Sequence, residues 1–229
     1  MSLSAIESTA GAMSYYLRLQ EVTANNLANM NTEAFKAVRL AARILPGTVS
    51  AEPVEQTDLR QGSFRETGRP LDLGLEGPGF LTVQTEDGDR LIRGGSFTLD
   101  AGGRLADLHG NPVLGTEGPL VLRGTEVEIQ GDGTILVDGA SVGRLRIQTV
   151  EDLALLRKEG GGRFIPIGPL QPASAETKVR QGAIEEPNFD PLLSMVDLVT
   201  IQRAYAANVD ALKAVDGVLH TIAGEVGKV

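Results

Sequence analysis

The distribution of proline and glycine constrains the fold of this chain more than any other feature. All 11 prolines lie from Pro46 to Pro191, and 24 of the 28 glycines lie between these positions. Because both residue types interrupt helices and serve turns, long helices are confined to the two ends. The 229 residues suffice for one or two domains with a sizeable core. We therefore predict helical ends around a turn-rich middle.

Each end carries apolar or small residues spaced alternately three and four apart, which is typical of a coiled-coil seam. The N-terminal seam is Leu3, Ile6, Ala10, Met13, Leu17, Gln20, Ala24 and Leu27, and the C-terminal seam is Leu198, Ile201, Tyr205, Asn208, Leu212, Val215, Leu219 and Ile222. Antiparallel pairing would place Leu27 near Leu198, and Gln20 one turn from Asn208. The alternative is two ordinary amphipathic helices on a globular core.

A second stripe on the last helix consists almost wholly of small residues. Its members are Ala204, Ala207, Ala211, Ala214 and Val218. One partner helix cannot easily cover both this stripe and the C-terminal seam, so the stripe indicates packing against further helices from other copies of the chain. The alternative explanation is that alanine is simply the best helix former.

The middle of the chain predicts short strands joined by tight turns. Residues 79–84 and 90–93 flank Asp87-Gly88, and residues 96–99 precede a second turn at Gly102-Gly103. Further strands are expected at 126–129, 134–137 and 144–147, and one short helix from the capping pattern at 149–152 to the glycines at 160–162. Such spacing indicates an all-β domain of hairpins.

The predicted fold class is therefore α+β, with N- and C-terminal helices pairing as a coiled-coil layer around a central all-β domain that contains one short helix. We expect a discontinuous helical assembly domain at 1–45 and 190–229. Connecting neck segments are expected at 46–70 and 176–189, and a β-rich outer domain at 71–175.

The formal net charge is −9, and the middle of the chain carries all of it because the two ends sum to zero. This balance disfavours a nucleic-acid partner, and no run approaches the ~18 apolar residues of a transmembrane helix. The absence of cysteine excludes a disulfide framework, a thiolate metal site and a thiol nucleophile. The start lacks the basic and apolar regions of a cleaved secretory signal.

Catalytic motifs are weak. Gly139-Ala140-Ser141-Val142-Gly143 matches the G-x-S-x-G pattern, but a strand rather than a helix is expected to follow it. The two histidines, His109 and His220, do not form an H-x-x-x-H pair for a metal. We therefore predict no catalytic residue, no cofactor and no metal site.

Residues 24–36 carry a resemblance to a known family. Their sequence, ANNLANMNTEAFK, resembles the A-N-N-(L/I)-A-N-x-x-T-x-G-(F/Y)-K signature of bacterial flagellar rod and hook proteins. Further matches are QGS at 61–63, TGRPLD at 67–72, GPGF at 77–80, RGGSF at 93–97, and QRAY at 202–205 with Asn208. Alanine stands at position 34, where the family commonly has glycine, so the first helix is expected to run on towards Arg43.

The resemblance implies a structural subunit of the flagellar basal-body rod, polymerising through its terminal helices into a tubular drive shaft that transmits torque. It also implies a periplasmic location and export by the flagellar type III apparatus without a cleaved signal. The implied partners are copies of the chain and neighbouring rod or hook proteins. Proximal and distal rod positions both remain open, as does a hook or hook-junction subunit. An alternative of another class is a secreted β-domain hydrolase acting on cell-wall glycan.

The expected assembly residues come from the two seams and the signature. We expect contacts between subunits for Asn25 and Asn26, which lie inside the helix, whereas Asn29 is equally well explained as a helix C-cap. The full set is Leu17, Gln20, Asn25, Asn26, Leu27, Asn29, Phe35, Gln202, Arg203, Tyr205, Asn208, Leu212 and Val215.

Overall fold

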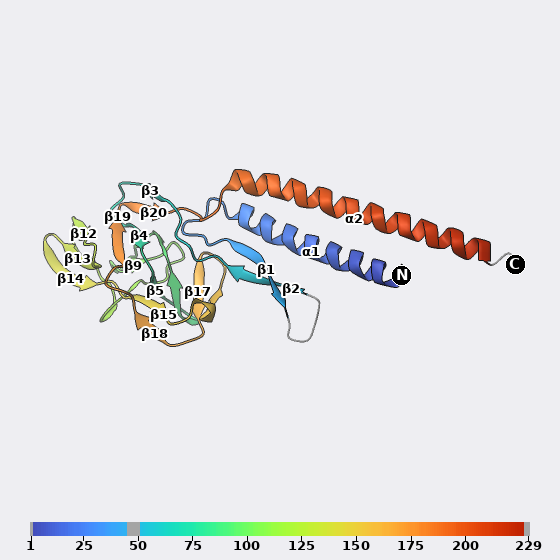
Figure 1. Ribbon diagram of the computed structural model, residues 1–229. Helices are drawn as coiled ribbons and strands as arrows, with labels where there is room; N and C mark the ends of the chain where they lie inside the picture. The colour runs from blue at the N-terminus through green and yellow to red at the C-terminus, as the bar shows by residue number, and fades with distance from the viewer. Residues whose placement is uncertain (1, 45–50, 227–229) are drawn as a thin grey trace. The chain divides into compact units, whose positions relative to one another are not determined.

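The computed structural model describes residues 2–44 and 51–226, with side chains over 9–41 and 53–218 (Figure 1). The chain forms two compact units. Residues 1–29, 38–56 and 190–229 make up the first, here called the helical unit, and residues 30–37 and 57–189 make up the second, here called the β unit. The α+β class is confirmed, because two terminal helices in contact flank a central region of short strands.

The helical unit is built from α1 (Ser2–Ala28), α2 (Pro191–Val226), β1 (Val38–Ile44) and β2 (Ala51–Thr57). The two helices run antiparallel and side by side (Figure 1). At its start, α2 is capped by Asp190, whose carboxylate accepts a 2.8 Å hydrogen bond from the backbone N–H of Leu192. The paired strands β1 and β2 also belong to this unit: β1 packs against α1, and Glu55 of β2 forms a 2.8 Å ion pair with Arg18 of α1.

The largest sheet of the β unit has six antiparallel strands. Its central hairpin pairs β5 with β6 as predicted, but the two-residue turn is Glu86-Asp87, one residue earlier than the expected Asp87-Gly88. In sheet order the strands are β16 (Leu156–Lys158), β17 (Arg163–Pro166), β6 (Gly88–Ile92), β5 (Phe80–Thr85), β15 (Ile147–Val150) and β18 (Leu170–Pro172).

Smaller antiparallel sheets complete the β unit. Asp138 and Gly139 both have positive φ, at 50° and 78°, and they form the tight turn between β13 and β14. The sheets are β19 (Lys178–Gln181), β4 (Asp72–Glu76) and β7 (Gly94–Ser96); β12 (Val127–Ile129), β13 (Thr134–Val137) and β14 (Ala140–Arg144); β20 (Ala183–Glu185) with β3 (Phe64–Glu66); β10 (Leu114–Gly115) with β11 (Gly118–Pro119); and β8 (Thr98–Leu99) with β9 (Leu105–Ala106).

Three predicted elements differ clearly from the observed ones. The strand expected at 96–99 is divided between the end of β7 and the whole of β8, which belong to different sheets. The strand expected at 144–147 is instead the end of β14 and the start of β15, which are separated by buried Leu145 and by Arg146. The short helix is a single 3-10 turn, η1 (Leu153–Leu155), which Asp152 caps by accepting from the N–H of Ala154 at 2.9 Å. It does not reach the glycines at 160–162, because β16 begins directly after it and pairs with β17.

The core of the β unit is apolar and lies between its sheets. The main cluster includes Leu73, Leu81 and Ile135, none of which is exposed, and a second cluster gathers around Phe80 and Phe164. The rings of Phe80 and Phe164 meet edge to face with centroids 5.5 Å apart. The β unit thus has a hydrophobic core of its own.

Candidate assembly site

The described part of the C-terminal seam faces inward along α2. Ile201 is buried, and its neighbours along the seam are half-buried at every third or fourth residue, as the heptad predicts. Asn208 donates from Nδ2 to the carbonyl of Ala204 at 2.8 Å, so one of its amide hydrogens is used within its own helix. The half-buried members are Leu198, Tyr205, Asn208, Leu212 and Val215.

The N-terminal seam is rotated from its predicted position. Leu17 is 45% exposed, and Ala10 and Ala24 are also exposed, whereas Met13, Gln20 and Leu27 are half-buried. Alpha1 packs against β1 as well as α2, so its covered face is broader than one seam and begins one residue earlier. That face includes Thr9, Ala12, Tyr16, Leu19, Thr23 and Asn26. Leu3, Ile6, Leu219 and Ile222 lie outside the described side chains.

The outer face of α2 is rich in exposed apolar side chains. Leu192 is 70% exposed and Leu193 is 61% exposed, and Val218 ends the small-residue stripe with 59% exposure. Ala207, Ala211 and Ala214 of that stripe are exposed too, whereas Ala204 is half-buried. Gln202 and Arg203 lie exposed between these positions. A monomer would leave this apolar surface in water.

The signature asparagines have different surroundings. Asn26 is buried and pairs with the backbone of Val38: its Nδ2 donates to the Val38 carbonyl at 2.8 Å, and its Oδ1 accepts from the Val38 N–H at 2.9 Å. Asn25 is exposed, and its carbonyl accepts a 2.9 Å hydrogen bond from Nδ2 of Asn29. Asn29 therefore caps the end of α1, while Asn26 holds the start of β1.

The first helix ends at Ala28 and does not continue towards Arg43, so the expected extension is wrong. Ala34 itself takes the left-handed conformation, with φ at 54°, although it is not a glycine. Its N–H donates to the carbonyl of Glu185 at 2.7 Å, and its side chain is buried. Contacts within the β unit, including this hydrogen bond to Glu185, hold Ala34 in a backbone conformation that glycine adopts more easily.

Phe35 packs inside the β unit. Its ring meets that of Phe189 edge to face with centroids 6.2 Å apart, and the ammonium of Lys158 lies 3.5 Å from the centre of the Phe35 ring. The same ammonium donates to the carbonyl of Lys36 at 2.6 Å. Lys158 therefore binds two consecutive residues of the signature.

Lys36 is fully buried and forms an ion pair with buried Glu185, at 2.5 Å between Nζ and Oε1. Glu185 also accepts from Nε of Arg93 at 3.3 Å and from the N–H of Gly62 at 2.8 Å. Burial lowers the pKa of Lys36 below its usual range, because Glu185 only partly offsets the lost hydration and Arg93 adds repulsion. We call Lys36, Arg93 and Glu185 the buried charge cluster.

Hydrogen bonds to the backbone complete this cluster. Arg93 donates to the carbonyls of Leu75, Gly77 and Gly79 at 2.8, 2.7 and 2.5 Å. Lys36 donates to the carbonyl of Arg60 at 2.8 Å. These carbonyls supply the partners that buried cations need, so the cluster stabilises the position of residues 30–37 within the β unit.

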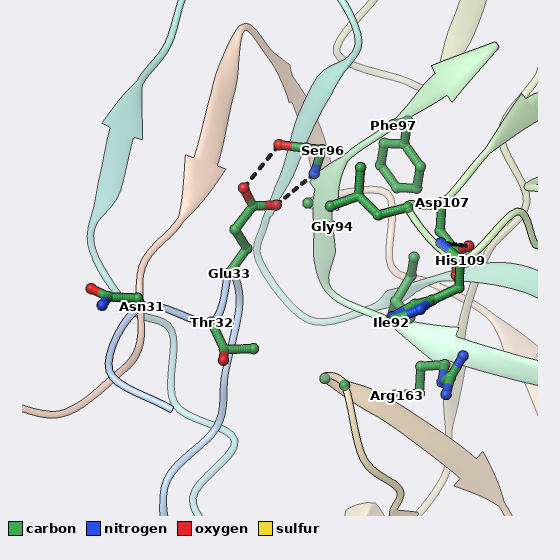
Figure 2. A pocket seen from close by; sticks show the side chains of 14 residues that line it. Asn31, Thr32, Glu33, Ile92, Gly94, Ser96, Phe97, Asp107, His109 and Arg163 are labelled. Atoms are coloured by element: carbon green, nitrogen blue, oxygen red, sulfur yellow. Dashed lines mark hydrogen bonds between the residues drawn. The ribbon is translucent and has the colours of Figure 1, made fainter. Parts of the chain in front are cut away.

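A pocket of about 290 Å³ lies beside the same segment (Figure 2). At its edge Glu33 accepts two hydrogen bonds from Ser96, at 2.7 Å from the backbone N–H and 2.8 Å from Oγ (Figure 2). His109 and Arg163 line the opposite side. Within the described residues, no group of three His, Cys, Asp or Glu side chains could hold a metal ion.

Ser141 lies in β14, opposite Leu136 of β13, and is exposed. The G-x-S-x-G match therefore spans a hairpin, since Gly139 forms the turn and a strand follows. A nucleophile elbow requires a strand-to-helix turn instead.

Sequence reasoning missed the residues that hold the signature segment, namely Lys158 and Glu185. A lysine that lies in an otherwise apolar environment requires an anion, but the partner of Lys36 lies 149 residues away. The one available signal was Glu185 itself, which continues an apolar strand after Ala183 and Ile184.

Comparison with known proteins identifies the family. A model described as flagella basal body rod protein matches residues 6–36, and one described as flagellar basal body rod FlgEFG protein C-terminal matches residues 180–224. The flagellar basal-body rod protein FlgF of Escherichia coli (strain K12) is 32% identical, with 93% of this chain and 94% of the relative covered. The chain belongs to the flagellar basal-body rod protein family. FlgF of Salmonella typhimurium is 31% identical over the same shares, and FlgG of Bacillus subtilis is 24% identical over 96% of this chain and 98% of that protein.

As a member of the basal-body rod family, the chain is a structural rod subunit and not an enzyme. The expectation of a rod protein is thereby confirmed, in preference to a hook subunit or a glycan hydrolase. Its place is the flagellar basal-body rod. No helix in the described part of this rod protein is long and apolar enough to cross a membrane.

Proposed function

We propose that this rod subunit polymerises through α1 and α2, with copies of itself and with neighbouring axial proteins, into the tubular shaft that transmits torque. The exposed apolar side chains on the outer face of α2 support this proposal best, because assembly would remove them from water. Export by the flagellar type III apparatus into the periplasm, without a cleaved signal, is part of the same proposal.

The proposed assembly residues fall into two groups. Leu17, Asn25, Gln202 and Arg203 are exposed and available to a neighbouring subunit, whereas Gln20, Leu27, Tyr205, Asn208, Leu212 and Val215 are half-buried. The half-buried group would act by holding the two helices together. Asn26, Asn29 and Phe35 have contacts within the subunit, and their role at an interface remains a proposal.

The test is Leu212→Asp in a strain that lacks its own copy of the protein. A carboxylate in the middle of the C-terminal seam costs roughly 1–3 kcal/mol or more, and the cost falls on the helical unit alone. We expect the variant to be absent from purified basal bodies and the cells to be non-motile, with unchanged thermal melting of the β unit.

The matched control is Leu108→Asp, the same change at a β-unit side chain that is 66% exposed. This control should enter basal bodies normally. Normal incorporation and motility of Leu212→Asp would rule out assembly that depends on the pairing of α1 with α2.

A further inference from the structure

The backbone passes between the helical unit and the β unit four times. The passages lie at residues 29/30, 37/38, 56/57 and 189/190. A single extended segment bends easily about its φ and ψ angles. Connecting segments that are not hydrogen-bonded to one another therefore transmit force between the two units poorly. Any residue that joins several passages therefore decides how stiffly the two units are connected.

Asn188 joins three of these passages from within the β unit. Its Oδ1 accepts from the N–H of Ala37 at 2.8 Å. Its Nδ2 donates to the carbonyl of Asp58 at 2.7 Å and to that of Arg60 at 2.9 Å. Both amide hydrogens and the amide oxygen of Asn188 therefore form hydrogen bonds. Their backbone partners lie one to four residues from a passage.

A backbone hydrogen bond adds to this arrangement. The N–H of Asp58 donates to the carbonyl of Ala37 at 2.8 Å, so residues 37, 58 and 188 form a closed set of contacts. The carbonyl of Arg60 also accepts from Lys36, which links the set to the buried charge cluster. Only an amide side chain offers two donors and an acceptor here, because a carboxylate would face two carbonyl oxygens without a hydrogen to donate.

We propose that Asn188 is a positioning residue that makes three backbone passages move as one body, so that force between the helical unit and the β unit is shared among them. This inference rests on the proposed function in a torque-transmitting rod. Asn188 lies on neither helix, so the inference concerns the stiffness of the connection and not the helix contacts proposed for assembly.

The first experiment measures hydrogen exchange in full-length Asn188→Ala and Asn188→Asp. The informative amide is that of Asp58, which bonds to Ala37 and not to Asn188, so its exchange reports whether the passages separate. We expect exchange at Asp58 to be about tenfold faster, with unchanged exchange at core residues such as Leu81. Exchange at Asp58 within about twofold of the parent protein, or an equal rise throughout the core, would overturn the proposal.

The control is Asn111→Ala, which removes an amide that bonds to Asp107 in a turn of the β unit. It should leave exchange at Asp58 unchanged.

The second experiment measures swimming speed in media of low and high viscosity for cells carrying each variant. We expect both Asn188 variants to enter basal bodies and to lose more speed than the parent at high viscosity. An identical dependence on viscosity would overturn the proposal. Absence of the unmodified protein from basal bodies would instead refute the proposed function, while the exchange result on the purified chain would still stand.

Discussion

The ammonium of Lys36 and the carboxylate of Glu185 lie 2.5 Å apart, with neither side chain exposed, although 149 residues separate them in the sequence. Lys36 comes shortly after α1, and Glu185 ends the strand before α2. Arg93 shares the same carboxylate at 3.3 Å. Two buried cations therefore depend on one anion.

This imbalance predicts unequal effects of removing each partner. Glu185→Leu leaves two buried cations without their anion and should lower the free energy of unfolding by about 3–5 kcal/mol. Lys36→Met leaves the Arg93–Glu185 pair intact and should cost only about 1–3 kcal/mol. Urea denaturation of both variants measures the difference. Arg157→Met, at an exposed position of β16, is the control and should change stability by less than about 0.5 kcal/mol. Equal losses for Glu185→Leu and Lys36→Met would contradict the shared-anion arrangement.

The lowered pKa of Lys36 predicts a dependence of stability on pH. Burial makes the folded protein bind this proton more weakly than the unfolded chain, whose lysine pKa is near 10.5. Between the lowered value and 10.5 the unfolded chain holds more protons, so the Lys36 contribution to stability rises with pH across that window. Below the window the full cost of burying the charge is present.

The measurement is the free energy of unfolding from about pH 7 to about pH 10, for the parent protein and for Lys36→Met. Other groups titrate in both proteins and cancel in the difference. We expect the parent to gain stability relative to the variant as the pH rises. A constant difference would show that burial does not perturb this lysine.

Ala34 predicts a stabilising substitution. Its φ of 54° is costly for a residue with a Cβ, and Ala34→Gly should raise the free energy of unfolding by up to about 1 kcal/mol, after the greater freedom of glycine in the unfolded chain is subtracted. Ala37→Gly is the matched control, at an equally buried alanine without positive φ, and should lower stability by about 0.5–1 kcal/mol. Thermal melting of the two variants distinguishes them, and a loss of stability in both would refute the strain at Ala34.

Ser141→Ala should leave stability and motility unchanged, because the hydroxyl is exposed on a hairpin strand. A fluorophosphonate probe should label neither the parent nor the variant. Labelling of the parent that disappears in Ser141→Ala would be incompatible with a purely structural protein.

Local signals in the sequence predicted most of the secondary structure. The hairpin of residues 80–92 and the inward face of α2 around Ile201 were predicted from spacing alone, because each depends on neighbours along the chain. The covered face of α1 was predicted wrongly, because this helix packs against β1 as well as α2. The face is therefore rotated, and Leu17 is exposed. A heptad describes one partner helix and carries no information about a second neighbour.

The anchoring of the signature could not be predicted for a related reason. Lys36, Arg93 and Glu185 come from three distant parts of the chain, and no spacing rule connects them. The end of the first helix was also predicted wrongly, because contacts of Ala34 with Glu185 override the preference of alanine for helix.

The buried members of the signature carry one more consequence. All of their side-chain partners described above lie within one subunit. Asn26 bonds to Val38, Phe35 contacts Phe189 and Lys158, and Lys36 pairs with Glu185. At these positions the motif stabilises the fold of the individual subunit and does not select its neighbours. In the proposed assembly, the side chains that distinguish one neighbouring subunit from another would be exposed ones on α2, such as Leu192 and Leu193. Two chains with identical buried signatures would then take different positions along the rod.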